Sequence, residues 1–225
     1  MSKPLALIVG VGEGLSASLA RLLAKEGYAI ALATRDTAKC AALAAETGAS
    51  THVCDASDPA AVKALFDALP ARPDVAIYNP SFRVRGALVD LDPAEVRKTI
   101  EITAFGAFLV AQAAARKMLA AGGGTIIFTG ASAGVKGYAK SAPFAMGKFA
   151  LRGLAQSMAR ELHPQGVHIG HIVIDGGIRS SRRIDDGNDK LLDPDAIAQT
   201  YLHLIRQPRD AWSWEIEVRP WAEAF

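Results

Sequence analysis

Cysteine is scarce in this sequence. Among 225 residues only Cys40 and Cys54 occur, and two thiols suit a reducing compartment better than a disulfide scaffold. We therefore expect a cytoplasmic protein. The five histidines do not stand at metal-ligand spacing from these cysteines, which argues against a zinc site, and we expect no bound metal.

Charge of one sign and long apolar runs are also lacking. The 25 basic and 23 acidic side chains leave a formal net charge of +2, which argues against nucleic acid or an anionic membrane as a partner. No segment reaches the ~18 consecutive apolar residues of a membrane helix. The first apolar run, Leu5–Val9, is shorter than the ~7–15 residues of a signal-peptide core, so we interpret it as a buried strand.

Apolar residues are plentiful and follow a regular order. Half of the residues are apolar and 21% are charged, which is sufficient for a hydrophobic core, and the length suits one domain spanning 1–225. Short apolar runs predict strands covered on both faces: Leu5–Val9, Tyr28–Ala33, Ser50–Val53, Val75–Tyr78, Thr125–Thr129, Val167–Ile174 and Ile216–Val218. Longer alanine-rich stretches predict helices: Gly14–Glu26, Asp36–Thr47, Pro59–Leu69, Pro93–Leu119, Ser141–Leu162 and Pro194–Leu204.

Proline and glycine mark the ends of these elements. Three predicted helices begin with an N-cap aspartate before a proline: Asp58-Pro59, Asp92-Pro93 and Asp193-Pro194. Gly27 and Gly48 follow two others, where a left-handed residue ends a helix. The alternation predicts a single Rossmann-type α/β domain, doubly wound, with about seven parallel strands and helices on both faces. The polar segment Arg179–Lys190 is expected to be irregular and to lie at the carboxyl edge of this sheet.

A glycine cluster joins the first predicted strand to the first predicted helix. Gly10, Gly12 and Gly14 are followed by Leu15 and Ser16. Glycines let the backbone turn sharply and approach a pyrophosphate, and the helix N-terminus offers N–H groups to it. A tight turn without a ligand is the alternative, but the strand–turn–helix context favours a dinucleotide site.

The spacing Gly-x-x-x-Gly-x-Ser resembles the glycine motif of the short-chain dehydrogenase/reductase family, with Ser16 in place of the third glycine. Further matches follow in the family's order, at 78–81, 86–88, 100–103 and 175–176. The resemblance implies a nicotinamide dinucleotide held by Gly10, Gly12, Glu13, Gly14, Leu15, Arg35, Asp55, Ala56, Asn79, Pro80, Ser81, Lys148, Gly176, Ile178 and Ser180. It also implies a homodimer or homotetramer built on helices 93–119 and 141–162.

The end of the second predicted strand bears on the choice between NAD and NADP. An acid there accepts the ribose hydroxyls of NAD, whereas a nearby arginine accommodates the 2′-phosphate of NADP. Arg35 directly follows the strand, which favours NADP, with NAD as the alternative. Two acids oppose this preference, because Glu13 would repel the 2′-phosphate and Asp36 would favour NAD if it turned inward.

Most of the family's catalytic residues are missing. The resemblance implies a tyrosine followed four residues later by lysine, a serine after the fifth strand and an asparagine in the fourth helix. This sequence has Phe144 before Lys148, Ala131 at the serine position and Thr103 at the asparagine position. A positioned acid or base contributes typically ~10²–10⁴-fold to a rate, so carbonyl reduction without replacements should be very slow.

Other polar side chains are candidates to replace the missing groups. Ser132 and Tyr138 carry hydroxyls close to the expected site, and with Lys148 they form the predicted catalytic set. The alternatives are a turn hydroxyl for Ser132 and a surface aromatic for Tyr138. His171 and Asp175 are further candidates, with a buried polar group and a turn residue as the alternatives.

Two functions from different classes remain open. The first is an NADP-dependent oxidoreductase with a non-standard active site, which transfers a hydride to or from a small carbonyl or alcohol substrate. The second is a dinucleotide-binding sensor or structural partner without redox turnover, which Phe144 and Ala131 favour. A lyase or isomerase on the same scaffold is a third alternative, because a fold does not fix a function.

Overall fold

A parallel sheet of seven strands forms the centre of the computed structural model, which describes residues 3–181, 183–184, 187 and 189–222. Within this part of the chain the strand order is β3 (Ser50–Val53), β2 (Ala29–Thr34), β1 (Leu5–Val9), β4 (Val75–Tyr78), β5 (Gly124–Thr129), β6 (Val167–Ile174) and β9 (Glu215–Val218). The order reverses between β1 and β4, which is where a doubly wound sheet binds its ligands. The predicted α/β fold is confirmed.

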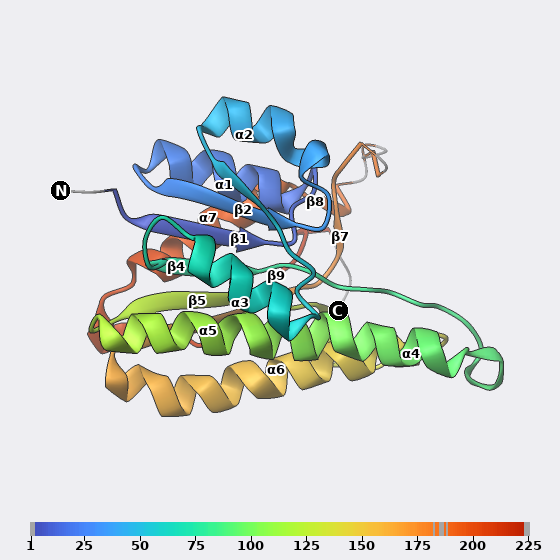
Figure 1. Ribbon diagram of the computed structural model, residues 1–225. Helices are drawn as coiled ribbons and strands as arrows, with labels where there is room; N and C mark the ends of the chain where they lie inside the picture. The colour runs from blue at the N-terminus through green and yellow to red at the C-terminus, as the bar shows by residue number, and fades with distance from the viewer. Residues whose placement is uncertain (1–2, 182, 185–186, 188, 223–225) are drawn as a thin grey trace.

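Helices cover both faces of this sheet (Figure 1). One face is covered by α1 (Leu15–Lys25), α2 (Ala41–Thr47) and α7 (Pro194–Arg206). The other is covered by α3 (Pro59–Ala68), α5 (Gly106–Ala120) and α6 (Ala142–Leu162). The alternation along a strand explains the two cores: Leu5, Leu7 and Val9 pack against the second group of helices, and Ala6 and Ile8 against the first.

The aspartate–proline signals correctly place three helix starts. In each case the aspartate side chain accepts a hydrogen bond from the backbone N–H two residues later: Asp58 from Ala60, Asp92 from Ala94 and Asp193 from Asp195. The helix predicted from Asp36 is different, because it begins with a 3₁₀ segment, η1 (Thr37–Cys40), before α2. The other predicted boundaries lie within two residues of the observed ones.

The predicted helix 93–119 is longer and less regular than expected. It consists of α4 (Pro93–Ile100), a π-helical turn η3 (Glu101–Phe105) and α5. The whole helix Pro93–Ala120 has 28 residues and is long and apolar enough to cross a membrane, a property that the count of consecutive apolar residues missed. The buried share of its most apolar window is 44%, because one side packs against the sheet, as in any core helix.

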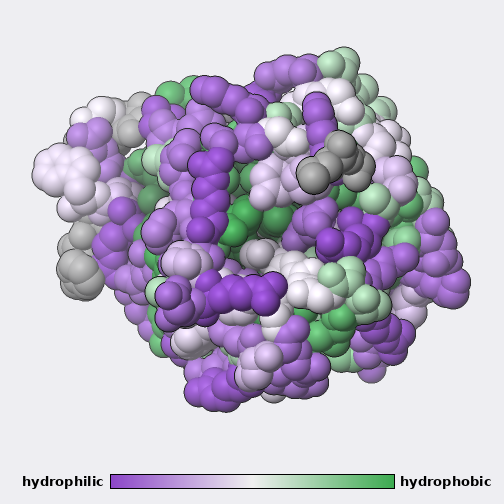
Figure 2. All heavy atoms as spheres, turned by 90° about the vertical axis from the view of Figure 1, so that its left-hand side faces the viewer, coloured by the Kyte–Doolittle hydropathy of each residue, from purple (hydrophilic) through white to green (hydrophobic). Residues whose placement is uncertain are grey.

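The described residues of the polar segment 179–190 lie at the carboxyl edge of the sheet, as predicted, while 182, 185–186 and 188 lie outside the part of the chain that the structure describes. Two short parallel strands, β7 (Gly177–Ile178) and β8 (Leu191–Leu192), flank it (Figure 1). The segment is therefore held at both ends, and Ser180 also pairs with Arg183. Figure 2 shows the opposite side of the molecule, at the amino ends of the strands, where hydrophilic residues surround a central area of hydrophobic ones.

Candidate active site

A cleft of about 1080 Å³ opens at the carboxyl edge of the sheet. Its walls come from segments far apart in the sequence: the ends of β4, β5 and β6, the start of α6, and the chain around β7 and β8. Parallel strands end together at this edge, so their loops converge there. The cleft contains Asn79, Ser81, Ser132, Tyr138, Lys148, Gly176 and Ile178 from the predicted set.

The glycine turn lies between β1 and α1. Gly10 has φ +83°, and a Cβ atom there would stand 2.6 Å from the Pro80 ring, so only glycine fits. Gly12 and Gly14 have no atom within 4 Å of the place where a Cβ would stand. No side chain caps α1 at Gly14. The turn thus has open space beside uncapped backbone N–H groups, which fits the pyrophosphate of a dinucleotide.

Ser16, the departure from the family's glycine motif, is integrated into the turn. Its buried hydroxyl donates to the Gly10 carbonyl at 2.7 Å and accepts from the Asn79 amide at 2.6 Å. The serine therefore ties the start of α1 to the end of β4. The extra hydroxyl is thus buried with both a donor and an acceptor partner where α1 packs against the strands.

The end of β2 presents Arg35 to solvent, while the acid beside it is occupied. The Asp36 carboxylate caps η1 by accepting from Ala38 N at 3.1 Å, and it forms an ion pair with Lys39 at 3.3 Å. Asp36 is thus turned toward its own helix. This geometry removes one of the two objections to a phosphate beside Arg35.

Asp55 and Ala56 follow β3 near Arg35. The Asp55 carboxylate accepts hydrogen bonds from the hydroxyl and the backbone N–H of Ser57, which together with the charge of Arg35 hold its pKa below the usual range. Ala56 is buried, and its carbonyl stands 2.7 Å from the place where a Cβ on Gly106 would lie. Gly106 thereby allows α5 to approach this loop closely.

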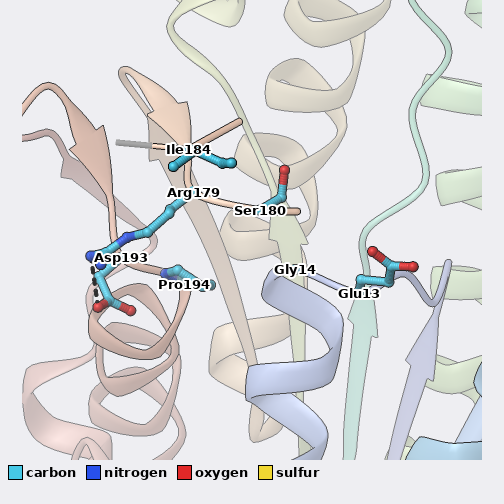
Figure 3. A pocket seen from close by; sticks show the side chains of 7 residues that line it. All are labelled: Glu13, Gly14, Arg179, Ser180, Ile184, Asp193 and Pro194. Carbon is cyan, nitrogen blue, oxygen red and sulfur yellow. Dashed lines mark hydrogen bonds and ion pairs between the residues drawn. The ribbon is translucent and has the colours of Figure 1, made fainter. Parts of the chain in front are cut away.

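A smaller hollow of about 360 Å³ lies between the glycine turn and the segment after β7. Figure 3 shows the Glu13 side chain pointing away from Arg179 and Asp193, which lie on the opposite side of the hollow. Arg179 and Asp193 form an ion pair, with 2.9 Å between Nη2 and Oδ2. The Glu13 carboxylate accepts a hydrogen bond from the Ser181 hydroxyl at 2.7 Å. Glu13 and Ser180, both in the predicted cofactor set, therefore belong to this hollow and not to the main cleft.

Lys148 is buried in the wall of the main cleft. Its ammonium donates to the Thr129 carbonyl at 2.7 Å, and burial lowers its pKa to about 7. Phe144 lies one turn earlier on α6, with Lys148 Nζ 5.8 Å from the ring centroid. A Cβ on Gly134 would stand 3.0 Å from the Lys148 carbonyl, so the loop after β5 packs directly on the α6 backbone.

The two candidate hydroxyls both line the cleft. Ser132 begins a 3₁₀ turn, η4 (Ser132–Gly134), directly after Ala131. Tyr138 is 44% exposed, and the Lys136 ammonium lies 5.7 Å from its ring centroid. The structure thus brings Ser132, Tyr138 and Lys148 to one cavity.

Thr103, at the position of the family's asparagine, is fully buried in the π-helical turn. Its hydroxyl accepts from Phe82 N at 3.4 Å, which holds the loop after β4. The turn is further fixed by the Tyr78 hydroxyl, which donates to the Ile102 carbonyl. Thr103 lies outside the described lining of the cleft, so its role is to shape the loop.

His171 belongs to a buried network behind the cleft. Its Nδ1 donates to the Glu215 carboxylate at 2.9 Å, and that carboxylate also accepts two hydrogen bonds from Arg152. Burial lowers the pKa of His171 to about 4, so the ring is neutral at pH 7. Its Nε2 is buried, with no hydrogen-bond partner in the described part of the chain.

Asp175 does line the cleft, but its charge is compensated. The carboxylate forms ion pairs with Arg219 at 2.9 Å and with Lys136 at 3.7 Å. Both His171 and Asp175 are therefore engaged in structural networks. Neither supplies an unengaged acid at the position of the missing tyrosine.

Comparison with known proteins agrees with this architecture. The sequence model of the short chain dehydrogenases matches residues 4–187. The chain belongs to the short chain dehydrogenase family. The trans-4-hydroxycyclohexanecarboxylate dehydrogenase of Sinomonas cyclohexanicum is 32% identical over 187 residues, which cover 76% of this chain and 71% of that protein. The D-threitol dehydrogenase of Mycolicibacterium smegmatis is 29% identical over 175 residues, which cover 74% and 67%.

Solved structures of short chain dehydrogenases have the same fold. One from Rhodopseudomonas palustris has a TM-score of 0.86 and 33% identity, covering 98% of this chain and 100% of that one. A metagenomic short-chain oxidoreductase in complex with NADP has a TM-score of 0.86 and 29% identity, covering 98% of both chains. The family thus consists of oxidoreductases whose fold holds a nicotinamide dinucleotide.

Four basic residues of this short chain dehydrogenase escaped the sequence analysis. Arg83, Arg85, Lys140 and Arg183 all line the main cleft. The signal was available, because Arg83 and Arg85 follow the fourth strand almost at once. Net charge concealed them, since acids elsewhere on the chain balance their charge in the total.

Proposed function

We propose that this protein is an NADP(H)-dependent oxidoreductase that interconverts a small carbonyl compound and its alcohol. One observation carries the proposal: Lys148 lies buried in a cleft that also contains Asn79 and Gly176. The open glycine turn follows β1, which pairs with β4, the strand that ends before Asn79. This is the arrangement required to hold a nicotinamide with a substrate beside it.

The bound cofactor would supply or accept the hydride, and the chain would handle the proton. We assign the proton donor role to Tyr138 and the polarisation of the substrate oxygen to Ser132, because both hydroxyls line the cleft. Lys148 would bind the nicotinamide ribose. Because its pKa lies near 7, both of its protonation states are populated at neutral pH, so it is also suited to resupply the proton.

The choice of NADP rests on Arg35. Its guanidinium is exposed at the end of β2, and the neighbouring Asp36 is engaged in capping η1. Replacing Arg35 with alanine should weaken NADPH binding about tenfold or more, since charge-assisted hydrogen bonds contribute ~1.5–3 kcal/mol. NADH binding should change little. Equal losses for both cofactors would contradict the assignment.

We further propose a cytoplasmic homodimer or homotetramer. Phe105, Phe108, Met146 and Phe149 are 40–51% exposed along η3, α5 and α6, and Phe105 stacks on Phe108 with ring centroids 6.2 Å apart. An exposed apolar surface of this kind is typical of subunit contacts. Replacing Phe108 and Phe149 with glutamate should therefore produce monomers in sedimentation experiments.

The second candidate function is dinucleotide binding without redox turnover. Phe144 and Ala131 favour it, because neither side chain has an ionisable proton or a hydrogen-bond donor. The two candidates differ in what happens after the cofactor binds. NADPH titration followed by a panel of carbonyl and alcohol substrates distinguishes them.

Turnover with at least one substrate would support the oxidoreductase. In that case Tyr138→Phe should lower kcat by ~10²-fold or more, and an unchanged rate would exclude Tyr138 as the acid. Binding of NADPH without turnover across the panel would support the second candidate. Failure to bind either cofactor would contradict both.

A further inference from the structure

The substrate end of the main cleft carries a concentration of positive charge. Arg83, Arg85, Lys140 and Arg183 line it together. In the part of the chain that the structure describes, none of these four forms an ion pair with an acid. The acid in the same wall, Asp175, is already compensated by two other cations. Among the described residues, the lining of the cleft therefore has more positive charge than its acids compensate.

Arg83 is placed close to the expected reaction centre. Its guanidinium carbon lies 4.8 Å from the centroid of the Phe144 ring, which occupies the position of the family's catalytic tyrosine. Partial burial of its guanidinium lowers the pKa of Arg83, and the charges of Arg85 and Arg183 add to this effect. Three guanidinium groups therefore repel one another around one space, an arrangement that an anion would relieve.

The local backbone holds these residues in place. The Gly86 N–H donates to the Lys140 carbonyl at 3.1 Å, which joins the loop after β4 to the segment before α6. Arg183 lies across Gly177, since its Nη1 stands 2.8 Å from the place where a Cβ on that glycine would be. The four basic side chains thus line the cleft from three separate segments: the loop after β4, the residues before α6 and the residues after β7.

We propose that this cleft is specific for substrates that carry an oxyanionic group, a carboxylate or a phosphate, beside the carbonyl or alcohol that reacts. The Arg83 and Arg85 guanidinium groups would bind the anion through paired N–H donors, a geometry that matches carboxylate and phosphate oxygens. Lys140 and Arg183 would add charge. This inference rests on the proposed function for the reacting group, but the anion site itself is testable without turnover.

The test measures binding by isothermal titration calorimetry, with the full-length protein alone and saturated with NADP⁺. The probes share one ring and one aldehyde: 4-carboxybenzaldehyde, 4-formylphenyl phosphate and the neutral methyl 4-formylbenzoate. We expect at least one anionic probe to bind about tenfold or more tightly than the ester. The ratio should fall as salt is raised. Comparison of the two anions decides between carboxylate and phosphate.

Variants locate the anion site. Arg83→Ala and Arg85→Ala should each reduce the preference for the anion by about fivefold or more, whereas Arg83→Lys should retain part of it, because charge remains but the paired donors do not. The matched control is Arg160→Ala, near the far end of α6. Since Arg83 and Arg85 are exposed, folding should persist, and circular dichroism checks this.

Three results would overturn the anion site: no binding by either anion, equal affinity for ester and anions, or a preference that survives both alanine variants. Lack of NADPH oxidation with every probe, despite an intact binding preference, would instead count against the proposed oxidoreductase function. The two failures are therefore distinguishable.

Discussion

The region that is expected to hold the cofactor and the region that is expected to perform the chemistry differ in how much of the family pattern they keep. Around β1, α1 and β4 the single departure in the glycine motif, Ser16, is accommodated by hydrogen bonds to Gly10 and Asn79. Around β5, α6 and the π-helical turn η3, the family resemblance implies that the tyrosine, the serine and the asparagine are replaced by Phe144, Ala131 and Thr103. Only Lys148 is kept.

The difference follows from what each task requires. A pyrophosphate site consists mainly of backbone N–H groups and open space, so side chains there vary as long as the turn keeps its shape. Proton transfer requires an ionisable group within hydrogen-bond reach of the reacting oxygen, and a phenylalanine side chain has no such group. The first region therefore tolerates side-chain changes that leave the turn intact, whereas the second is sensitive to the loss of a single reacting group.

The largest expected effect comes from restoring the catalytic region. Phe144→Tyr combined with Ala131→Ser should raise kcat for carbonyl reduction by ~10²-fold or more, with little change in NADPH affinity. Stopped-flow measurement of NADPH oxidation checks this. Ala45→Ser, at an exposed position of α2 outside the lining of the cleft, is the control. An unchanged rate would show that the site differs from the family's in more than these two side chains.

A second experiment disrupts the cofactor region. Gly10→Ala should lower the free energy of unfolding by about 3 kcal/mol, because φ is +83° and the added methyl group would overlap the Pro80 ring. Gly12→Ala should change stability by about 0.5 kcal/mol or less, since no atom lies within 4 Å of its Cβ position. Urea denaturation measures both. Similar losses for the two variants would refute the steric argument.

The burial of Lys148 should make the free energy of unfolding depend on pH. Its pKa is lowered from 10.5 to about 7 in the folded state, so at pH 6 both folded and unfolded chains carry the charge and the full cost of burial is present. Between pH 7 and 10.5 only the unfolded chain binds this proton, so stability rises with pH.

Lys148→Met removes that charge. The variant should be about 2 kcal/mol more stable than the wild type at pH 6, after the loss of the bond to Thr129 is subtracted. Because the wild type should gain about 4 kcal/mol between pH 7 and pH 10, the difference should pass through zero and reverse by pH 10. Urea denaturation at pH 6, 8 and 10 measures the difference, with the exposed Lys25→Met as control. A pH-independent difference would contradict the lowered pKa.

The smallest expected effect concerns Ser16. Ser16→Ala removes the two hydrogen bonds of the Ser16 hydroxyl, to the Gly10 carbonyl and from the Asn79 amide, and should cost about 1 kcal/mol. Ser18→Ala, at another buried serine of α1, should cost less. Thermal denaturation compares them. If the two variants are equal, the bridge through Ser16 does not stabilise the turn.

The sequence predicted the elements well where local chemistry controls them. The aspartate–proline pairs mark helix starts because the cap is formed within three residues, and Gly48 ends α2 in the left-handed conformation. The sequence analysis did not predict the π-helical turn at 101–105, and one of its contacts, the hydrogen bond from the Tyr78 hydroxyl to the Ile102 carbonyl, comes from β4, distant along the chain. The 3₁₀ start before α2 was missed as well.

The candidate site shows the same division. Motif spacing located the glycine turn in the sequence and predicted that Lys148 and Phe144 lie close to the site, and both line the main cleft. Their roles in catalysis stay predictions. The sequence left the role of Asp36 open, and the fold shows that this carboxylate caps η1. Likewise, His171 is far along the chain from Glu215, and only the pairing of β6 with β9 brings them together.

The sequence by itself determined the order of strands and helices along the chain and the glycine turn between the first strand and the first helix, because each depends on residues that are neighbours along the chain. The tertiary structure alone decided which charges face the same space. Arg83 and Arg183 are distant in sequence and nearly invisible in a net charge of +2, yet they line one cleft. Loops meet at the carboxyl edge only when the parallel sheet forms, so the positive charge of the main cleft depends on the tertiary structure.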